Sequence, residues 1–275
     1  DYHSIHLQEP VVDFPCEGKE TFIDQIFKVI ADHKPLTFKL VGFPFKSINT
    51  EQKVISSQPD MAERSALEHL NELCSQIQSL YSPGAHIVIL TDGHIFCDVF
   101  QVSDAEVETY ETTLKALASD LPHVTIQTLA DLLPKDIDYQ ALREKFDHLS
   151  ASEIDQKSLD LMKERLAFEL NGIDSNLDHL AKTMMQRSHH YASFLLKQPS
   201  LAPMISLSVH FQKNIARKMG IYLVGKSPIT PWHGAFVTAA DGSVSIQYKK
   251  DINDQDYQVV SKIVNGVPCA FYRHR

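Results

Sequence analysis

Apolar residues recur along the first 130 residues with two alternating spacings. Helical spacing runs through residues 20–35, 59–81 and 104–122, and Pro35 marks the end of the first of these segments. Short apolar runs of strand length occupy residues 36–43, 85–90 and 123–129. Strands that alternate with helices in this way predict a parallel sheet with helices packed on its faces, which is an α/β fold.

The spacing changes twice after this region. Residues 136–200 have helical spacing without a strand-like run, whereas residues 201–275 contain β-like runs. Asp241-Gly242 and Asn265-Gly266 each separate two such runs, which predicts two hairpins. We therefore expect an α/β core over 1–135, a helical segment over 136–200, and a β-rich part over 201–275 that completes the active site. We expect the three to form one compact unit.

Composition narrows the class of protein. The net charge of −9 argues against a nucleic-acid-binding protein, which needs a basic face. No run of 18 apolar residues occurs, so no membrane span is predicted, and the first ten residues lack the pattern of a signal peptide. The four cysteines lie far apart without a CxxC pair, which fits a reducing cytoplasm. We expect a cytoplasmic protein.

One segment matches a nucleotide-binding motif in sequence, but its neighbouring residues do not favour the structure that the motif requires. Residues 220–227, GIYLVGKS, match GxxxxGK[ST], yet the four inner residues favour a strand and Pro228 and Pro231 oppose the helix that a phosphate loop requires. No GxGxxG, GxSxG or HExxH motif occurs. The chain therefore predicts a site without cofactor or metal.

Candidate residues follow the first two predicted strands. In open α/β sheets ligands bind at the carboxyl ends of the strands. Asp92 comes directly after the run 85–90, in a segment that is equally typical of a plain Asp-Gly turn, and Asp98 follows six residues later. At the end of the run 36–43, Phe43 offers an aromatic wall. Lys46, after this run, and Lys39, within it, are candidate cations for a phosphate. A rigid loop without function fits the same letters.

Three more segments carry candidate chemistry. Asp60 and Glu63 form either an acid/base or amine-binding pair or a helix capping box, and the two interpretations can coexist. Ser208 and His210 alternate with apolar residues and so share one face of a strand, where a histidine is more often simply a satisfied polar residue. The single tryptophan, Trp232, precedes His233 in a proline-bounded loop. Imidazole carries protons near neutral pH, which makes both histidines candidates for catalysis.

Five short blocks resemble one known family in the same order. They are GFPFKSIN (42–49), PDMAE (59–63), YSPGAHIVILTDGHIFCD (81–98), LSVH (207–210) and TPWHG (230–234). These blocks are similar to the isocyanide (isonitrile) synthases, the PvcA-like family that includes the spore-wall dityrosine biosynthesis protein. They span residues 36–240, which is most of the chain.

The resemblance implies a fold and an activity. The fold is a Rossmann-like core. The activity is a cofactor-free conversion of the α-amino group of tyrosine or tryptophan to an isonitrile, with carbon from ribulose 5-phosphate. An iron- and 2-oxoglutarate-dependent oxygenase often acts next. On this basis the catalytic candidates are His210, Asp92 and His233. The substrate-binding candidates are Lys39, Phe43, Lys46, Asp60, Glu63, Asp98, Ser208 and Trp232.

One position departs from the family. An arginine commonly precedes the LS-H block there, whereas this chain has Ser206. If that arginine contacts an anion, another cation must replace it, and Lys213, Arg64 and Arg187 are the candidates. The departure keeps open a non-catalytic homologue that binds a sugar phosphate or an amino acid. A second alternative is a related condensing enzyme that yields a formamide, because an isonitrile and a formamide differ by water.

Overall fold

The computed structural model describes residues 19–133, 137–148, 154, 156–172, 176–195, 197, 205–206 and 234–275. One of its two four-stranded sheets has the strand order β3-β2-β1-β4, and all its pairs are parallel. The strands are β1 (Leu36–Val41), β2 (Ala85–Leu90), β3 (Val124–Gln127) and the short β4 (Ile205–Ser206). The inner strands carry apolar side chains on both faces, and Ile87 and Ile89 of β2 are fully buried. Such runs are typical of a parallel sheet covered on both sides.

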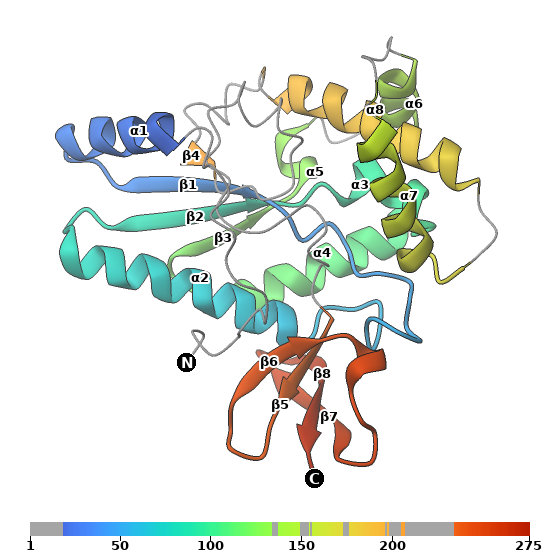
Figure 1. Ribbon diagram of the computed structural model, residues 1–275. Coiled ribbons are helices and arrows are strands. Elements are labelled where there is room, and N and C mark those ends of the chain that lie inside the picture. The colour runs from blue at the N-terminus through green and yellow to red at the C-terminus, as the bar shows by residue number, and fades with distance from the viewer. Residues whose placement is uncertain are drawn as a thin grey trace.

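Helices pack against this sheet as the sequence predicts. Figure 1 shows α2 (Met61–Leu80) and α4 (Asp104–Ala118) below the sheet, with α1 (Lys19–Ala31) on the other side of β1. Leu67 and Cys74 of α2 and Leu114 of α4 form one core cluster with the buried side chains of β1 and β2. The apolar stripe of each helix therefore faces the sheet.

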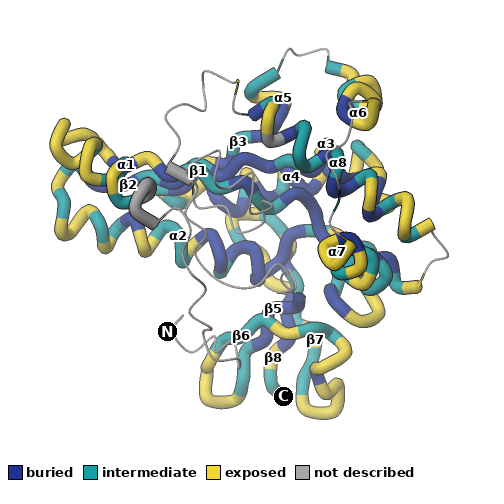
Figure 2. Tube along the Cα trace, turned by 45° about the horizontal axis from the view of Figure 1, so that its top comes forward, coloured by how far each residue is buried: buried dark blue, intermediate teal, exposed yellow. Residues whose placement is uncertain are grey.

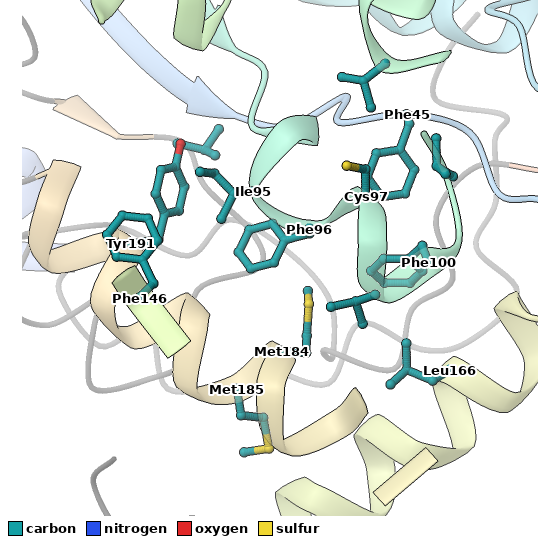
Figure 3. Packing of buried hydrophobic residues seen from close by; sticks show 14 of the residues in the cluster. Phe45, Ile95, Phe96, Cys97, Phe100, Phe146, Leu166, Met184, Met185 and Tyr191 are labelled. Carbon is teal, nitrogen blue, oxygen red and sulfur yellow. The ribbon is translucent and has the colours of Figure 1, made fainter. Parts of the chain in front are cut away.

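A second layer of helices covers the carboxyl end of the sheet. The short α3 (Gly93–Phe96) and the 3₁₀ turn η2 (Cys97–Phe100) follow β2 directly. After β3 come α5 (Leu129–Leu132), α6 (Tyr139–Asp147), α7 (Gln156–Glu169) and α8 (Leu177–Leu195). Figure 3 shows Phe96 and Phe100 packed among Tyr191, Phe146 and Met184. This core joins the expected helical segment to the end of β2.

The C-terminal residues form a separate sheet with the order β6-β5-β8-β7. Its strands are β5 (Ala235–Thr238), β6 (Val244–Gln247), β7 (Tyr257–Val264) and β8 (Val267–His274), with the 3₁₀ turn η4 (Lys249–Asp251) before β7. Phe236 and Phe271 belong to the same core cluster as the apolar face of α2, so this sheet packs against α2. In Figure 2 its buried side faces the rest of the protein, while its hairpin tips are exposed.

Both predicted hairpins are confirmed. β5 and β6 pair antiparallel across a turn in which Gly242 has φ of 81°. β7 and β8 pair with Val264 opposite Val267, so Asn265 and Gly266 alone form the turn, with φ of 51° and 79°. Two positive φ values in a two-residue turn are the type I′ geometry that Asn-Gly favours.

The α/β fold class is confirmed, and one detail adds to it. β4, which belongs to the expected β-rich part, pairs with β1 instead of joining the C-terminal sheet. No helix among the described residues combines the length and the apolar character that crossing a membrane requires.

Candidate functional site

The segments that follow β1 and β2 lie in close contact. A Cβ atom at Gly93 would lie 2.2 Å from the carbonyl oxygen of Pro44 and 2.7 Å from a methyl carbon of Val107. No side chain fits there, so Gly93 lets the start of α3 rest on the loop after β1. In that loop Phe43 has φ of 55°, a left-handed conformation that is uncommon for a residue with a side chain and is concentrated at functional sites.

Asp92 stands at the junction of β2 and α3. It occupies the N-cap position of α3 but makes no side-chain capping hydrogen bond. The pKa of this carboxyl group is raised to about 7, mainly by burial; a hydrogen bond from its own backbone amide opposes the rise, and the charge of Glu111 contributes to it. The residue keeps partial solvent access. A carboxyl group that titrates near neutral pH at the ligand edge of a sheet is suited to proton transfer.

Asp60 and Glu63 form the predicted capping box, and Lys46 completes it. The Asp60 carboxylate accepts a hydrogen bond from the Ala62 backbone amide at 2.8 Å, and the Glu63 carboxylate accepts one from the Asp60 amide at 2.8 Å. Lys46 Nζ donates to Asp60 and lies 3.1 Å from Glu63 Oε2. All three are buried. Two carboxylates therefore share one ammonium group.

The charges of this cluster shift its pKa values. The pKa of Asp60 is raised to about 7, because burial and the charge of Glu63 together outweigh the opposing effect of Lys46. Burial by itself lowers the pKa of Lys46, but Glu63 and Asp60 outweigh it, so the pKa of Lys46 is raised. The cluster can exchange a proton near neutral pH, and its lysine is already neutralised by the two carboxylates.

A buried polar network that the sequence analysis did not identify continues from Asp92 into α4. His94 Nδ1 lies 2.7 Å from Asp104 Oδ1, and His94 Nε2 lies 3.8 Å from Glu111 Oε2. Thr91 donates a hydrogen bond to the other oxygen of Glu111. Burial raises the pKa of Glu111, although the Thr91 hydrogen bond opposes the rise. The signal was present, because Glu111 lies three residues before Leu114 on the apolar stripe of α4.

Asp98 is held by an arginine. Arg187 of α8 donates to both carboxylate oxygens of Asp98, at 2.6 and 3.1 Å, and to both oxygens of Asp147, at 2.9 and 2.7 Å. It also donates to the carbonyl oxygen of Ile95 at 2.7 Å. The Arg187 side chain is 2% exposed. These bonds anchor α8 on α3 and η2, so the described contacts give Asp98 a structural task; its contact with substrate stays a prediction.

The remaining candidates are placed in part. Lys39 lies within β1, two residues before its end, and partial burial lowers its pKa. Ser206 lies in β4, in register with Lys39. Arg64, one of the suggested replacement cations, forms a bidentate pair with Asp120 at 2.6 and 3.0 Å. Four site candidates lie outside the described residues: Ser208, His210, Trp232 and His233. Lys213, another suggested replacement cation, lies outside them too.

The candidate site therefore comprises two groups at the end of the parallel sheet. Asp92 with its Glu111 neighbour forms one group, and Lys46 with Asp60 and Glu63 forms the other. Within the described ranges, no set of three or more His, Cys, Asp or Glu side chains is placed to hold a metal ion. The arrangement can bind polar groups and move protons.

Comparison with known proteins shows which family the chain belongs to. The sequence profile of the pyoverdine/dityrosine biosynthesis proteins matches residues 26–169 and 155–260. The chain belongs to this family. The predicted resemblance is thereby confirmed, and the segments after β1 and β2 and at the start of α2 fall within the matched residues.

Individual relatives of this family extend over most of the chain. An L-tyrosine isonitrile synthase of Xenorhabdus nematophila is 31% identical over 98% of this chain and 85% of its own length. Isocyanide synthase A of Aspergillus fumigatus is 29% identical over 93% of this chain, which spans less than half, 46%, of that relative. The crystal structure of the PvcA protein from Pseudomonas aeruginosa superimposes with a TM-score of 0.75 at 25% identity, covering 94% of this chain and 93% of that one.

Proposed function

We propose that this protein converts the α-amino group of an aromatic amino acid, tyrosine or tryptophan, to an isocyanide, with ribulose 5-phosphate as the carbon donor. The observation that carries the proposal is the similarity to an L-tyrosine isonitrile synthase over 98% of the chain. Asp92, an acid with a pKa of about 7 at the carboxyl end of β2, supplies the group that the chemistry requires.

The chemistry consists of proton transfers and bond cleavage. The amine attacks the C2 ketone of the pentulose, a carbon–nitrogen bond forms, and the ketone oxygen leaves as water to give an imine. The carbon of an isocyanide is bonded to nitrogen alone, so both carbon–carbon bonds of C2 must then break, which makes the enzyme a carbon–carbon lyase. One bond leaves its electron pair on C2 while its sugar fragment loses a hydroxyl proton and departs as an aldehyde; the other pair departs with its fragment, which takes up that proton. The amine must be neutral to attack, and a base with a pKa near the working pH removes its proton most effectively.

The described geometry supports a role for Asp92 in this step. Its carboxyl group makes no capping hydrogen bond, so it is available to a ligand. Phe43, in the adjacent loop, is proposed to form an aromatic wall for the substrate side chain. His210, His233 and Trp232 are proposed to complete the site, with Ser208 beside them. Asp60 and Glu63 are proposed to bind the amino group of the amino acid, and Lys39 and Lys46 are proposed to bind the phosphate of the pentulose.

The test is direct. The purified protein is incubated with each aromatic amino acid and ribulose 5-phosphate that carries ¹³C at C2. A product with an isonitrile infrared band and one labelled carbon supports the proposal. A labelled formamide, which differs by one water in mass, indicates the related condensing enzyme. Substrate binding by calorimetry without any product indicates a non-catalytic homologue.

The product determines the next enzyme. The product retains the carbon skeleton of the amino acid, which an oxygenase can oxidise. We therefore propose that an iron- and 2-oxoglutarate-dependent oxygenase acts next in the pathway. Co-expression of such an oxygenase tests this: the isocyanide should be consumed only when both proteins are present.

A further inference from the structure

A hydroxyl group that lacks a hydrogen-bond partner is buried beside the candidate site. Tyr191 of α8 is 0% exposed, and its hydroxyl oxygen has no partner among the described residues. Buried polar groups are nearly always paired, because a buried group without a partner loses its hydrogen bonds to water and gains none in return. Nε2 of the adjacent His190 is also buried without a partner in the described part of the chain. Two neighbouring side chains of α8 thus each have a buried polar atom without a hydrogen-bond partner among the described residues.

The ring of Tyr191 is held rigidly. It meets Phe96 edge-on, with ring centroids 5.9 Å apart, and packs against Phe146 at 6.4 Å. In Figure 3 the hydroxyl oxygen points away from Phe146 and α8, on the side of Ile95. One turn earlier on α8, Arg187 donates to the Ile95 carbonyl oxygen, which fixes α8 against α3. The hydroxyl has a fixed position because both its ring and its helix are anchored.

That side of Tyr191 adjoins the turn that holds Asp92, because the Ile95 amide donates a hydrogen bond to the Asp92 carbonyl oxygen at 3.0 Å. Burial raises the pKa of Tyr191 well above its ordinary value, and the charges of Asp92 and Glu111 add to the rise. The phenol therefore stays protonated at neutral pH and can act as a donor, but not as a base. Asp92, with a pKa of about 7, can take up a proton near neutral pH. Tyr191 is therefore suited to donate a hydrogen bond and Asp92 to accept a proton, because their environments separate their pKa values.

We propose that the Tyr191 hydroxyl contacts the substrate and donates a hydrogen bond to the C2 oxygen of the pentulose while Asp92 accepts the proton of the attacking amine. This inference rests on the proposed function. When the amine attacks, the carbonyl electron pair moves to that oxygen, and a fixed donor in a water-poor site stabilises the charge that develops. The proton that Asp92 takes from the amine can then go to the same oxygen to give a hydroxyl group. The second proton of the nitrogen follows by the same route, so the hydroxyl leaves as water and the carbon–nitrogen double bond of the imine forms.

The substitution Tyr191→Phe removes the hydroxyl and keeps the ring. We expect kcat to fall about 100-fold, as when one oxyanion donor is removed, with a smaller change in KM. We expect the melting temperature without ligand to stay equal or rise, because an unpaired buried hydroxyl is lost. Tyr272→Phe is the matched control, since Tyr272 is 3% exposed in β8 of the C-terminal sheet. It should leave kcat unchanged.

The outcomes separate this inference from the proposed function. If the wild-type protein forms no isocyanide, the proposed function fails and this inference falls with it. If the wild type is active and Tyr191→Phe keeps its kcat, the inference alone is wrong. A clear drop in the melting temperature of Tyr191→Phe would also overturn it, because the hydroxyl would then have a structural partner.

Discussion

Nζ of Lys46 lies 3.1 Å from Oε2 of Glu63, inside the capping box that begins α2. The lysine comes from the loop after β1, so one ion pair joins the end of the parallel sheet to the start of the longest helix on its face. Asp60 shares the same ammonium group. A helix cap and a candidate substrate site are therefore built from the same three side chains, which is why sequence alone left both interpretations open.

Replacement of Lys46 by methionine tests which task dominates. Lys46→Met leaves two buried carboxylates without a cation, and we expect the free energy of unfolding to fall by about 3–5 kcal/mol. Lys39→Met is the matched control, because Lys39 is only partly buried and burial already disfavours its charge. It should cost less than about 1 kcal/mol. Urea unfolding followed by circular dichroism measures both. A Lys46 variant of native stability and weakened pentulose-phosphate binding would instead support the phosphate role.

Asp92→Asn should trade activity for stability. The folded-state pKa of about 7 lies above that of an unfolded aspartate, so the folded protein binds more protons between about pH 4 and pH 7. The contribution of Asp92 to stability is thus fully present below about pH 4 and is lost as the pH rises to 7. We expect Asp92→Asn to be more stable than the wild type at pH 8, by on the order of 2 kcal/mol, and to lose most turnover.

Asp104→Asn is the control for this pH dependence. Burial favours the neutral acid, but the hydrogen bonds from Arg143 and His94 outweigh it and lower the pKa of Asp104 to about 2. Its contribution is present above about pH 4 and is lost as the pH falls toward 2. Thermal unfolding between pH 3 and pH 8 should therefore show opposite trends for the two variants. Identical profiles would contradict the assignment of a raised pKa to Asp92.

The pair Asp98 and Asp147 separates an anchor from a substrate contact. Both carboxylates bind Arg187, but only Asp98 is a predicted substrate contact. If the described contacts are its whole role, Asp98→Asn and Asp147→Asn should each lower stability by about 1.5–3 kcal/mol and leave KM unchanged. Chemical unfolding and steady-state kinetics measure the two effects. A higher KM for Asp98→Asn alone would restore the substrate role.

The regular elements could be predicted because each carries its own signal. The stripe over 59–81 predicts α2, which spans Met61–Leu80, and Asn265-Gly266 specifies the turn between β7 and β8. Periodicity and turn chemistry are local properties, so they can be read without knowing the rest of the chain.

The site could be predicted only in part, because its contacts join distant segments. Asp92 was identifiable from its place after an apolar strand. The partner of Lys46 lies 14 residues away across a loop without periodicity, and Arg187 meets Asp98 from 89 residues away. Such pairings depend on how helices pack, and that information is not present in any short window. The orphan hydroxyl of Tyr191 is likewise a property of its surroundings.

The close approach at Gly93 supplies the sharpest test that the two strand ends form one site. Gly93→Ala would push a methyl group into the Pro44 carbonyl and Val107, so α3 and the loop after β1 must separate. We expect a loss of about 1–3 kcal/mol in stability. Because the shift also moves Asp92 away from the Phe43 loop, turnover should fall about 100-fold.

Gly42→Ala is the control in the same loop, since its added Cβ would have its nearest contact at 3.9 Å and should be tolerated. Equal activity of the two variants would show that the loop after β1 and the start of α3 act independently.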